Sequence, residues 1–525
     1  MPNLIFRSVF GSVLLLFPSI CLSVQAQEEL RSIAEAVGTI EELDLRAHVE
    51  VLADDSLEGR EAGSRGGHAA AKYIALHMKK YGLETAGDAG SYYQVFGKGY
   101  RNLLGLLPGT DTSLKDEVIV VGAHYDHVGY GSRTDSFGPY GTIHNGADDN
   151  ASGTSAILEM IEAFEQLEVG PRRSILFCLW DGEEKGLLGS KHWLSAPTLS
   201  LENVKFSINL DMIGRLRQEG LSVYGERTAA GLREFLSSAN LERLQIQFNW
   251  DIQPDSDHYP FIRKRIPTVM MHTGLHGEYH RPSDDIETLN YAGLQSVTRY
   301  VARTIWALAD RAESFRFRPA AMMESETARR TFERFAPPFS TRLGIALDPE
   351  MRAGDRENGL RIEKVLVGSP AAVAGLQAGD EILSLNGVTL KTQEQLWNLI
   401  FGVEKRVVLE VRNDSTGESR EVQVRLGGSP LRIGLSWRFD KGHPGLAYIT
   451  RVSTNSRADR AGLRPGHRIY RVNNEVMLTD LDLQQELNEA EGLLELQVES
   501  RGQVREVQIE LANPAMSQKS ESGHP

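Results

Sequence analysis

Apolar and polar positions alternate in blocks along residues 101–308, and these blocks predict buried strands separated by helices. Four short apolar runs have the pattern of strands buried on both faces; they cover residues 118–123, 174–180, 205–210 and 267–272. Helical patterns lie between and after them, at residues 154–167, 186–194 and 291–309. We therefore expect an α/β fold with a mostly parallel central sheet flanked by helices. Ligands of such sheets bind at the carboxyl ends of the strands.

The second half of the chain contains an internal repeat. The segment from Gly368 to Leu383 recurs from Asn455 to Tyr470, at an offset of 87 residues when Gly375 is matched to Gly462. This period suits two copies of a small β-rich domain. A linker rich in Arg and Glu, residues 311–338, separates the first copy from the α/β region.

The N-terminus has the pattern of a secretory signal peptide. A basic residue precedes an apolar run from Val9 to Leu22, and small residues near Ala26 offer a cleavage site. The run is short for a transmembrane helix. Cys21 suggests a lipoprotein, which we rank second because the large Ile20 precedes it. We expect residues 1–26 to be removed from a periplasmic or secreted protein whose mature chain has no transmembrane segment.

Composition narrows the classes of partner. The 525 residues carry a net charge of −14, which argues against nucleic acid as a partner. Hydrophobic residues make up 41% and charged residues 24%, so the chain is ordinary globular material of about two to four domains. Once residues 1–26 are removed, Cys178 is the only cysteine, and no intramolecular disulfide is expected.

Residues that can bind metal follow each predicted strand. They are His124 and Asp126 after the first, Glu183 and Glu184 after the second, Asp211 after the third, and His280 beyond the fourth. Asp148 and Asp149 lie in a turn rich in Gly and Asn, where Asp148 could bridge two metal ions. Taken singly, each has an ordinary explanation as a surface residue or a helix cap. Together, at one sheet edge, they suit two zinc ions, with manganese or cobalt as alternatives.

Five motifs in this order resemble the di-zinc aminopeptidases of the bacterial leucyl aminopeptidase and aminopeptidase Y type. The motifs are His124-x-Asp126, Ala147 to Gly153, Glu183-Glu184, Asn209-Leu210-Asp211 and Tyr279-His280. Glutamyl carboxypeptidases and glutaminyl cyclases are more distant relatives with the same core. The resemblance implies that residues 27–310 form a metallopeptidase domain.

The resemblance also implies a set of metal ligands. Asp148 would bridge both metal ions. Glu184 and His280 would complete one site, and His124 and Asp211 would complete the other.

Further residues would support this centre. Glu183 would act as the general base, and Asp126 would support the ligands around His124. Asp284 would support the ligands around His280. His276 is the alternative to His280 as a metal ligand. The peptide bond between the two adjacent aspartates of the turn would be cis, as in relatives.

One position departs from the resemblance. Some relatives carry a Tyr three residues before a Ser-Asp-His sequence, where it steadies the tetrahedral intermediate, and this chain has Gln253 there. Tyr259 or His258 could replace it as the oxyanion donor. No inserted domain separates the early helix from the metal motifs, which favours an exopeptidase on short substrates.

The internal repeat resembles two PDZ domains, at residues 339–427 and 428–512, followed by a disordered tail at 513–525. Residues 343–346 and 433–436 resemble the loops that bind a peptide carboxylate. PDZ domains add the C-terminal segment of a peptide to a sheet edge. The alternative is that these domains only pack on the catalytic domain or cover its cleft.

Together these features predict a zinc-dependent aminopeptidase acting on peptides with a free N-terminus. One alternative is a metallo-carboxypeptidase or a glutaminyl cyclase-like enzyme on the same core, and Arg215 or Arg281 could then bind a substrate carboxylate. The other is a catalytically dead PDZ adaptor. The intact Glu183 and the full ligand set speak against the adaptor.

Overall fold

A computed structural model describes residues 32–334, 342–348, 359–402, 405–413, 416–427, 433–452 and 456–511 of the chain. The expected signal peptide, residues 1–26, and the expected tail, residues 513–525, lie outside the described residues. No helix within the described ranges is long and apolar enough to cross a membrane.

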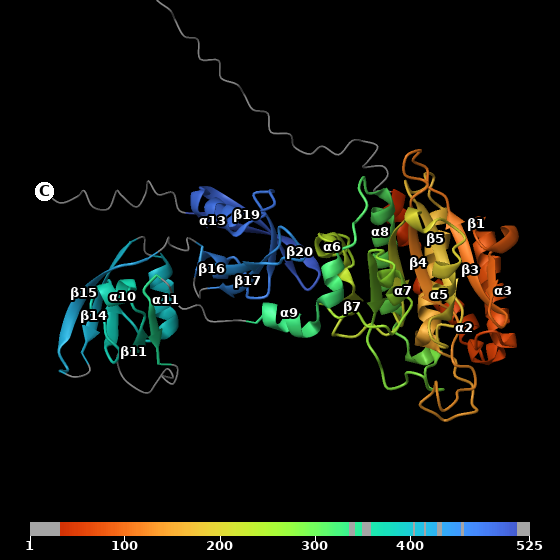
Figure 1. Ribbon diagram of the computed structural model, residues 1–525, viewed down its shortest axis with the longest axis horizontal. Coiled ribbons are helices and arrows are strands. Elements are labelled where there is room, and N and C mark those ends of the chain that lie inside the picture. The colour runs from red at the N-terminus through yellow and green to blue at the C-terminus, as the bar shows by residue number, and fades with distance from the viewer. Residues whose placement is uncertain are drawn as a thin grey trace, which may run out of the picture.

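A nine-stranded sheet forms the centre of the first domain (Figure 1). Its middle is parallel and consists, in spatial order, of β5 (Ser174–Trp180), β4 (Val118–His124), β6 (Val204–Leu210) and β9 (Thr268–His272). These are the four strands that the apolar runs predict, with ends displaced by no more than one residue. Nearly every side chain in them is buried, which explains why their sequences lack polar alternation.

The edges of the sheet contain strands that the apolar pattern did not predict. On one side lie β1 (Glu84–Thr85), β2 (Tyr93–Phe96) and β3 (Tyr100–Leu107), and on the other lie β7 (Leu221–Tyr224) and β8 (Ile246–Asn249). β3 pairs antiparallel with β5, and β7 pairs antiparallel with β9. Several of these strands have only four residues or fewer and one partly exposed face, which is too short a pattern to recognise in the sequence.

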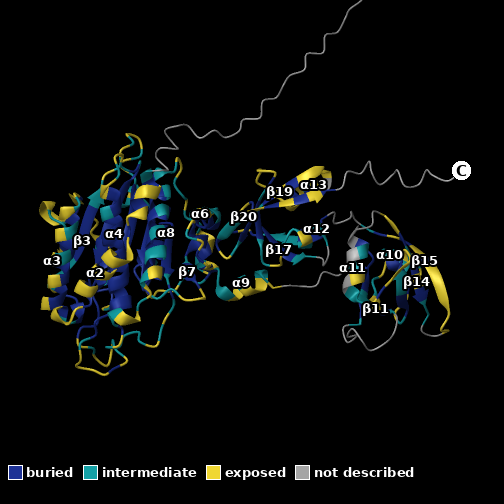
Figure 2. Ribbon diagram, turned by 180° about the vertical axis from the view of Figure 1, so that it is seen from behind, coloured by how far each residue is buried: buried dark blue, intermediate teal, exposed yellow. Residues whose placement is uncertain are grey.

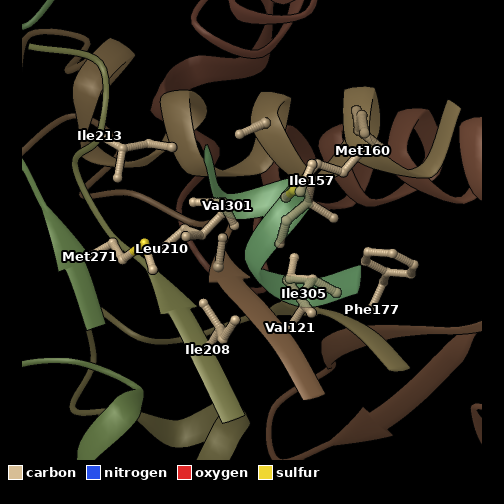
Figure 3. Close-up of a cluster of buried hydrophobic side chains, with 14 of the residues drawn as sticks. Val121, Ile157, Met160, Phe177, Ile208, Leu210, Ile213, Met271, Val301 and Ile305 are labelled. Carbon is tan, nitrogen blue, oxygen red and sulfur yellow. The ribbon is translucent and has the colours of Figure 1, made fainter. Parts of the chain in front are cut away.

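Helices cover both faces of this sheet (Figure 1). One face carries α2 (Glu42–Leu52), α3 (Arg65–Lys80), α4 (Gly153–Glu165) and α8 (Tyr291–Asp310), and the other carries α5 (Leu188–Ser195) and α7 (His258–Arg263). Figure 3 shows Ile157 of α4 and Ile305 of α8 among the sheet residues Val121, Phe177 and Ile208. This packing fixes the carboxyl ends of the parallel strands, where the predicted metal-binding residues lie.

Two small β domains follow, one for each copy of the repeat. The first has β10 (Ile345–Leu347), β11 (Leu360–Val365), β12 (Glu381–Leu385), β13 (Val388–Thr389), β14 (Arg406–Arg412) and β15 (Ser419–Arg425), with α10 (Pro370–Val373) and α11 (Gln393–Gly402). The second has β16 (Leu435–Phe439), β17 (Ala447–Val452), β18 (Arg468–Val472), β19 (Gly492–Ser500) and β20 (Gln503–Leu511), with α12 (Arg457–Arg460) and α13 (Asp480–Glu489). Each has its own apolar core.

The second small domain packs directly on the first domain of the chain. Arg227 forms an ion pair with Asp440 at 2.7 Å, and Arg233 forms one with Glu499 at 3.1 Å. The amide of Ile246 in β8 donates to the carbonyl of Arg501 in the β19–β20 turn. Figures 1 and 2 show this domain between the nine-stranded sheet and the first small domain, although it comes last in the sequence.

The segment expected as a linker is part of this interface. Residues 319–323 form a 3-10 turn, and α9 (Glu326–Phe332) follows. The Phe332 ring lies between those of Trp250 and Tyr448, with centroids 5.8 and 5.4 Å away. The described part of the linker, up to residue 334, therefore joins two domains that touch.

Candidate metal centre

The predicted residues meet at the carboxyl edge of the parallel strands. His124 ends β4, and Asp211 follows β6 directly. Glu184 follows β5, and His280 lies on the loop after β9. The described residues form three overlapping groups whose nitrogen and oxygen atoms lie within 4.8 Å of one another: His127, Asp149, Glu184 and His280; His124, Asp149 and Asp211; and His124, Glu183 and Glu184. The first two groups together contain all four of these side chains, and each of the two could hold one metal ion.

The residue shared by both groups is Asp149, not Asp148. Oδ1 of Asp149 lies 3.3 Å from Nε2 of His124, and its Oδ2 lies 3.1 Å from Nε2 of His280. Asp148 points away: its Oδ1 accepts a hydrogen bond from the amide of Gly214, and its Oδ2 lies 3.2 Å from His276. The prediction that Asp148 bridges two metal ions is therefore wrong, because side chains of adjacent residues point to different sides of the turn. The cis peptide bond is likewise Asp149–Asn150 rather than Asp148–Asp149.

The spacing within each group fits zinc. Four ligands at 2.0–2.1 Å from a tetrahedral ion lie about 3.3 Å from one another. The observed nitrogen–oxygen distances match this spacing: His280 lies 3.1 Å from Glu184, and His124 lies 3.5 Å from Asp211. Nε2 of His280 nevertheless forms no hydrogen bond, although it is buried and has carboxylate oxygens close by. A buried nitrogen without a hydrogen bond, facing carboxylates, fits a metal ligand.

The charge of the site also fits divalent cations. Asp126, Asp149, Glu183 and Asp211 are buried, and the side chain of Glu184 is only 8% exposed. Burial, together with the other carboxylates, raises the pKa of Glu183 well above its usual range, although His124 opposes the shift. Burial opposes protonation of His280, but Asp149 and Glu184 raise its pKa to about 11. Carboxylates in excess attract a cation strongly when water is largely excluded.

Asp126 contacts both a predicted metal ligand, His124, and the predicted general base, Glu183. Its Oδ1 accepts the amide of Glu183 at 3.0 Å, and its backbone carbonyl lies 3.2 Å from Nδ1 of His124. The second contact directs Nε2 of His124 toward Asp149 and Asp211. Asp126 thus fixes the orientation of His124 and the backbone at Glu183.

Two buried charged residues, Asp284 and Arg60, hold the backbone of the turn that carries Asp149. Asp284 accepts the amides of Asp148 and Asp149 at 3.1 and 3.0 Å, so it supports this turn rather than the ring of His280. Arg60 donates to four backbone carbonyls, among them those of Asn145 and Gly146. Burial lowers the pKa of Arg60 to about 10, a shift that the nearby carboxylates partly offset, and it stays cationic at neutral pH.

A pocket of about 150 Å³ lies over the two groups. Its apolar wall contains Met212, Met270 and Leu275, and its polar wall includes Tyr279. Neither proposed substitute for the missing oxyanion tyrosine, Tyr259 or His258, lines this pocket.

The arginines considered for a substrate carboxylate are engaged elsewhere. Arg215 forms an ion pair with Glu278, and Arg281 donates to the carbonyl of Phe137 at 2.8 Å. Neither lines the pocket over the metal-binding residues. Among the described residues, the pocket therefore lacks the arginine that would favour a carboxypeptidase.

Two site residues were not predicted. The side chain of His127 lies in the group with Asp149, Glu184 and His280 and is fully buried, although the sequence motifs assign it no role. Tyr279, quoted only as part of a motif, stacks on His280 with ring centroids 3.9 Å apart. The feature of the sequence that could have indicated a role for His127 is its position three residues after His124.

Comparison with known proteins is consistent with this site. Residues 102–305 match the family described as "Peptidase family M28", and residues 361–413 and 448–499 each match the PDZ domain. The leupeptin-inactivating enzyme 1 of Streptomyces exfoliatus is 25% identical over 292 residues, which cover 50% of this chain and 61% of that protein. The aminopeptidase YwaD of Bacillus subtilis is 30% identical over 202 residues, covering 36% of this chain and 41% of that protein.

Parts of two solved structures align with this chain. The LapA aminopeptidase of Legionella pneumophila is 19% identical, with a TM-score of 0.44 over 54% of this chain and 76% of that one. The zinc aminopeptidase BSAP of Bacillus subtilis is 18% identical, with a TM-score of 0.42 over 52% of this chain and 97% of that one. The chain spans between about two fifths and three fifths of the length of the curated relatives named above.

Proposed function

We propose that this protein, which contains an M28 peptidase domain followed by two PDZ domains, is a zinc-dependent aminopeptidase that removes N-terminal residues from peptides. The observation that carries the proposal is the pair of metal-binding groups that share Asp149 beside the buried Glu183. We assign His124 and Asp211 to one ion and Glu184 and His280 to the other, with Asp149 between them. The preferred metal is zinc, and manganese or cobalt would suit the same ligands.

Glu183 is suited to proton transfer. Bound zinc would lower the pKa of a water in the pocket and polarise the scissile carbonyl. Glu183 would take the proton of the attacking water and pass it to the leaving amine. Burial, together with the neighbouring carboxylates, raises the pKa of Glu183 above its usual range, which makes this carboxylate a stronger base than an exposed one.

The pocket favours cleavage near a chain end. A volume of about 150 Å³ accommodates little more than one side chain. The excess of buried carboxylates attracts the cationic α-amino group of a free N-terminus. Met212, Met270 and Leu275 would contact an apolar N-terminal side chain.

We further infer that the PDZ domains bind C-terminal segments of peptides, from substrates or partners. The signal-peptide pattern of residues 1–26 supports a periplasmic or secreted location for the enzyme.

Hydrolysis of aminoacyl chromogenic substrates by the purified protein tests the proposal. We expect turnover with zinc, loss of turnover after chelation, and no cleavage of N-acetylated substrates. Glu183→Gln should reduce kcat by about 10²–10⁴-fold while the metal content is unchanged. Two bound metal ions without turnover on any free-amine substrate would contradict the aminopeptidase assignment.

A further inference from the structure

Both the backbone and the side chain of His127 are held in place by their surroundings. Its side chain is fully buried, and its amide donates to the carbonyl of Arg60 at 3.2 Å. Gly146 leaves room for the ring, because a Cβ atom at that position would lie 2.5 Å from Cδ2 of His127. Both the backbone and the ring of His127 are therefore fixed beside the metal-binding turn.

The ring contacts one oxygen of Glu184. Nδ1 of His127 lies 2.9 Å from Oε1 of Glu184 in a hydrogen bond. The other oxygen, Oε2, lies 3.1 Å from Nε2 of His280. The two oxygens of this carboxylate thus have different partners: one faces His127, and the other faces the metal-binding group.

Hydrogen-bond geometry distinguishes the two rings: Nδ1 of His127 forms a hydrogen bond with Oε1 of Glu184, whereas Nε2 of His280, 3.1 Å from Oε2, forms none. Ligands of one tetrahedral zinc ion lie about 3.3 Å apart, and 2.9 Å is the usual length of an N–H···O hydrogen bond. Nδ1 of His127 also lies 3.8 Å from Asp149, farther than the 3.1 Å between His280 and Asp149. His127 therefore has the geometry of a donor to Glu184, whereas His280 has the geometry of a ligand.

We propose that His127 is a positioning residue that donates Nδ1–H to Oε1 of Glu184 and so leaves only Oε2 to bind metal. A carboxylate held in this way occupies one coordination position instead of two. The remaining position stays open for water or substrate, which a catalytic metal site needs and a structural site lacks. The inference rests on the proposed metal centre.

Three substitutions test the assignment in the full-length protein loaded with cobalt(II). His127→Asn keeps a donor at the same bond distance from Cβ as Nδ1, His127→Gln moves the donor one bond further out, and His127→Leu removes it. His144→Leu is the matched control, because His144 is also fully buried and hydrogen-bonded, but to Ser136 rather than to a metal-binding residue.

The readouts are the cobalt absorption spectrum and the affinity of each ion, measured by competition with a chromogenic chelator. In His127→Leu we expect weaker visible absorption, because Glu184 would bind through both oxygens and raise the coordination number. One ion of the two should bind 10–100-fold more weakly. His127→Asn should restore both values, His127→Gln should not, and His144→Leu should match the unaltered protein.

Other outcomes would overturn the assignment. His127→Leu with an unaltered spectrum and unaltered affinities would show that the hydrogen bond does not position Glu184. Complete loss of one ion in both His127→Leu and His127→Asn would make His127 a direct ligand. If His127→Leu does not fold, identical spectra for His127→Asn and His127→Gln would still contradict it. Failure of the unaltered protein to bind two ions would instead refute the metal centre on which the inference rests.

Discussion

Two regions of this protein bury clusters of charged side chains, and the charges are neutralised differently in the two regions. At the interface with the second PDZ domain, Arg227 pairs with Asp440 and Glu324, and Arg233 pairs with Glu499. At the metal centre buried carboxylates gather around histidines, and the buried guanidinium of Arg60 donates to backbone carbonyls instead of to these carboxylates. Buried charges persist only when they are paired. The charges at the interface are paired within the chain, whereas at the metal centre the carboxylates outnumber the nearby histidines, and a bound cation would neutralise the excess.

The largest expected effect distinguishes the two adjacent aspartates of the metal-binding turn. Asp149→Asn should release at least one of two metal ions and lower kcat by more than about 10³-fold, because Asp149 belongs to both groups. Asp148→Asn should keep both ions, because Asp148 contacts Gly214 and His276 instead. Metal content by mass spectrometry and turnover measure both variants. Equal metal loss in the two would contradict the assignment of Asp149.

These two adjacent aspartates also show how much of the site can be predicted from the sequence. Apolar runs located the four central strands, and the order of strands placed His124, Glu184, Asp211 and His280 at one edge. Which of two neighbouring aspartates faces inward depends on the path of the turn, and that path is set by Asp284 and Arg60, residues far apart in sequence.

The interface was not predictable for a related reason. Arg227 and Asp440 are 213 residues apart, and arginine and aspartate are ordinary surface residues in any sequence. Docking of the second PDZ domain becomes evident only when their partners are seen. The sequence left open the alternative that these domains pack on the catalytic domain, and for the second domain the structure shows that packing.

Breaking the paired cluster should destabilise the interface and leave the metal centre intact. Arg227→Met leaves the buried Asp440 without its main partner and should cost about 3–5 kcal/mol of unfolding free energy. The double variant Arg227→Met with Asp440→Leu should recover much of this cost, since no charge is then left unpaired. Urea unfolding followed by tryptophan fluorescence measures the effect, with metal content as the control. A cost below about 1 kcal/mol would mean that the ion pair is not desolvated.

Acid should weaken the same interface through His443, which is fully buried near Asp440, Arg227, Arg233 and Arg318. Burial lowers its pKa to about 3, so the folded protein keeps it neutral while the unfolded chain binds a proton below about pH 6.5. Stability is therefore fully present above pH 6.5 and falls as the pH drops toward 3.

At pH 5 this linkage amounts to about 2 kcal/mol relative to pH 7. Thermal unfolding of the protein and of His443→Asn at both pH values measures it, because the variant cannot titrate at that position. The same loss of stability in both proteins would assign the acid sensitivity to other groups.

The smallest expected effect concerns the first PDZ domain. Between described residues, the hydrogen bonds and ion pairs that join the peptidase domain to a PDZ domain reach residues 433–511, and none reaches residues 342–427. Replacing residues 339–427 by a short Gly-Ser linker should therefore leave kcat on a short aminoacyl substrate and the Tm of the peptidase domain unchanged within error. Calorimetry and the chromogenic assay measure both. A drop in Tm of several degrees would mean that the first PDZ domain also packs on the enzyme, whereas a selective loss of activity on longer peptides would assign it to substrate capture. The contrast then extends to the two copies of one repeat: buried charges join the second copy to the peptidase domain, and no such pair joins the described residues of the first copy to it.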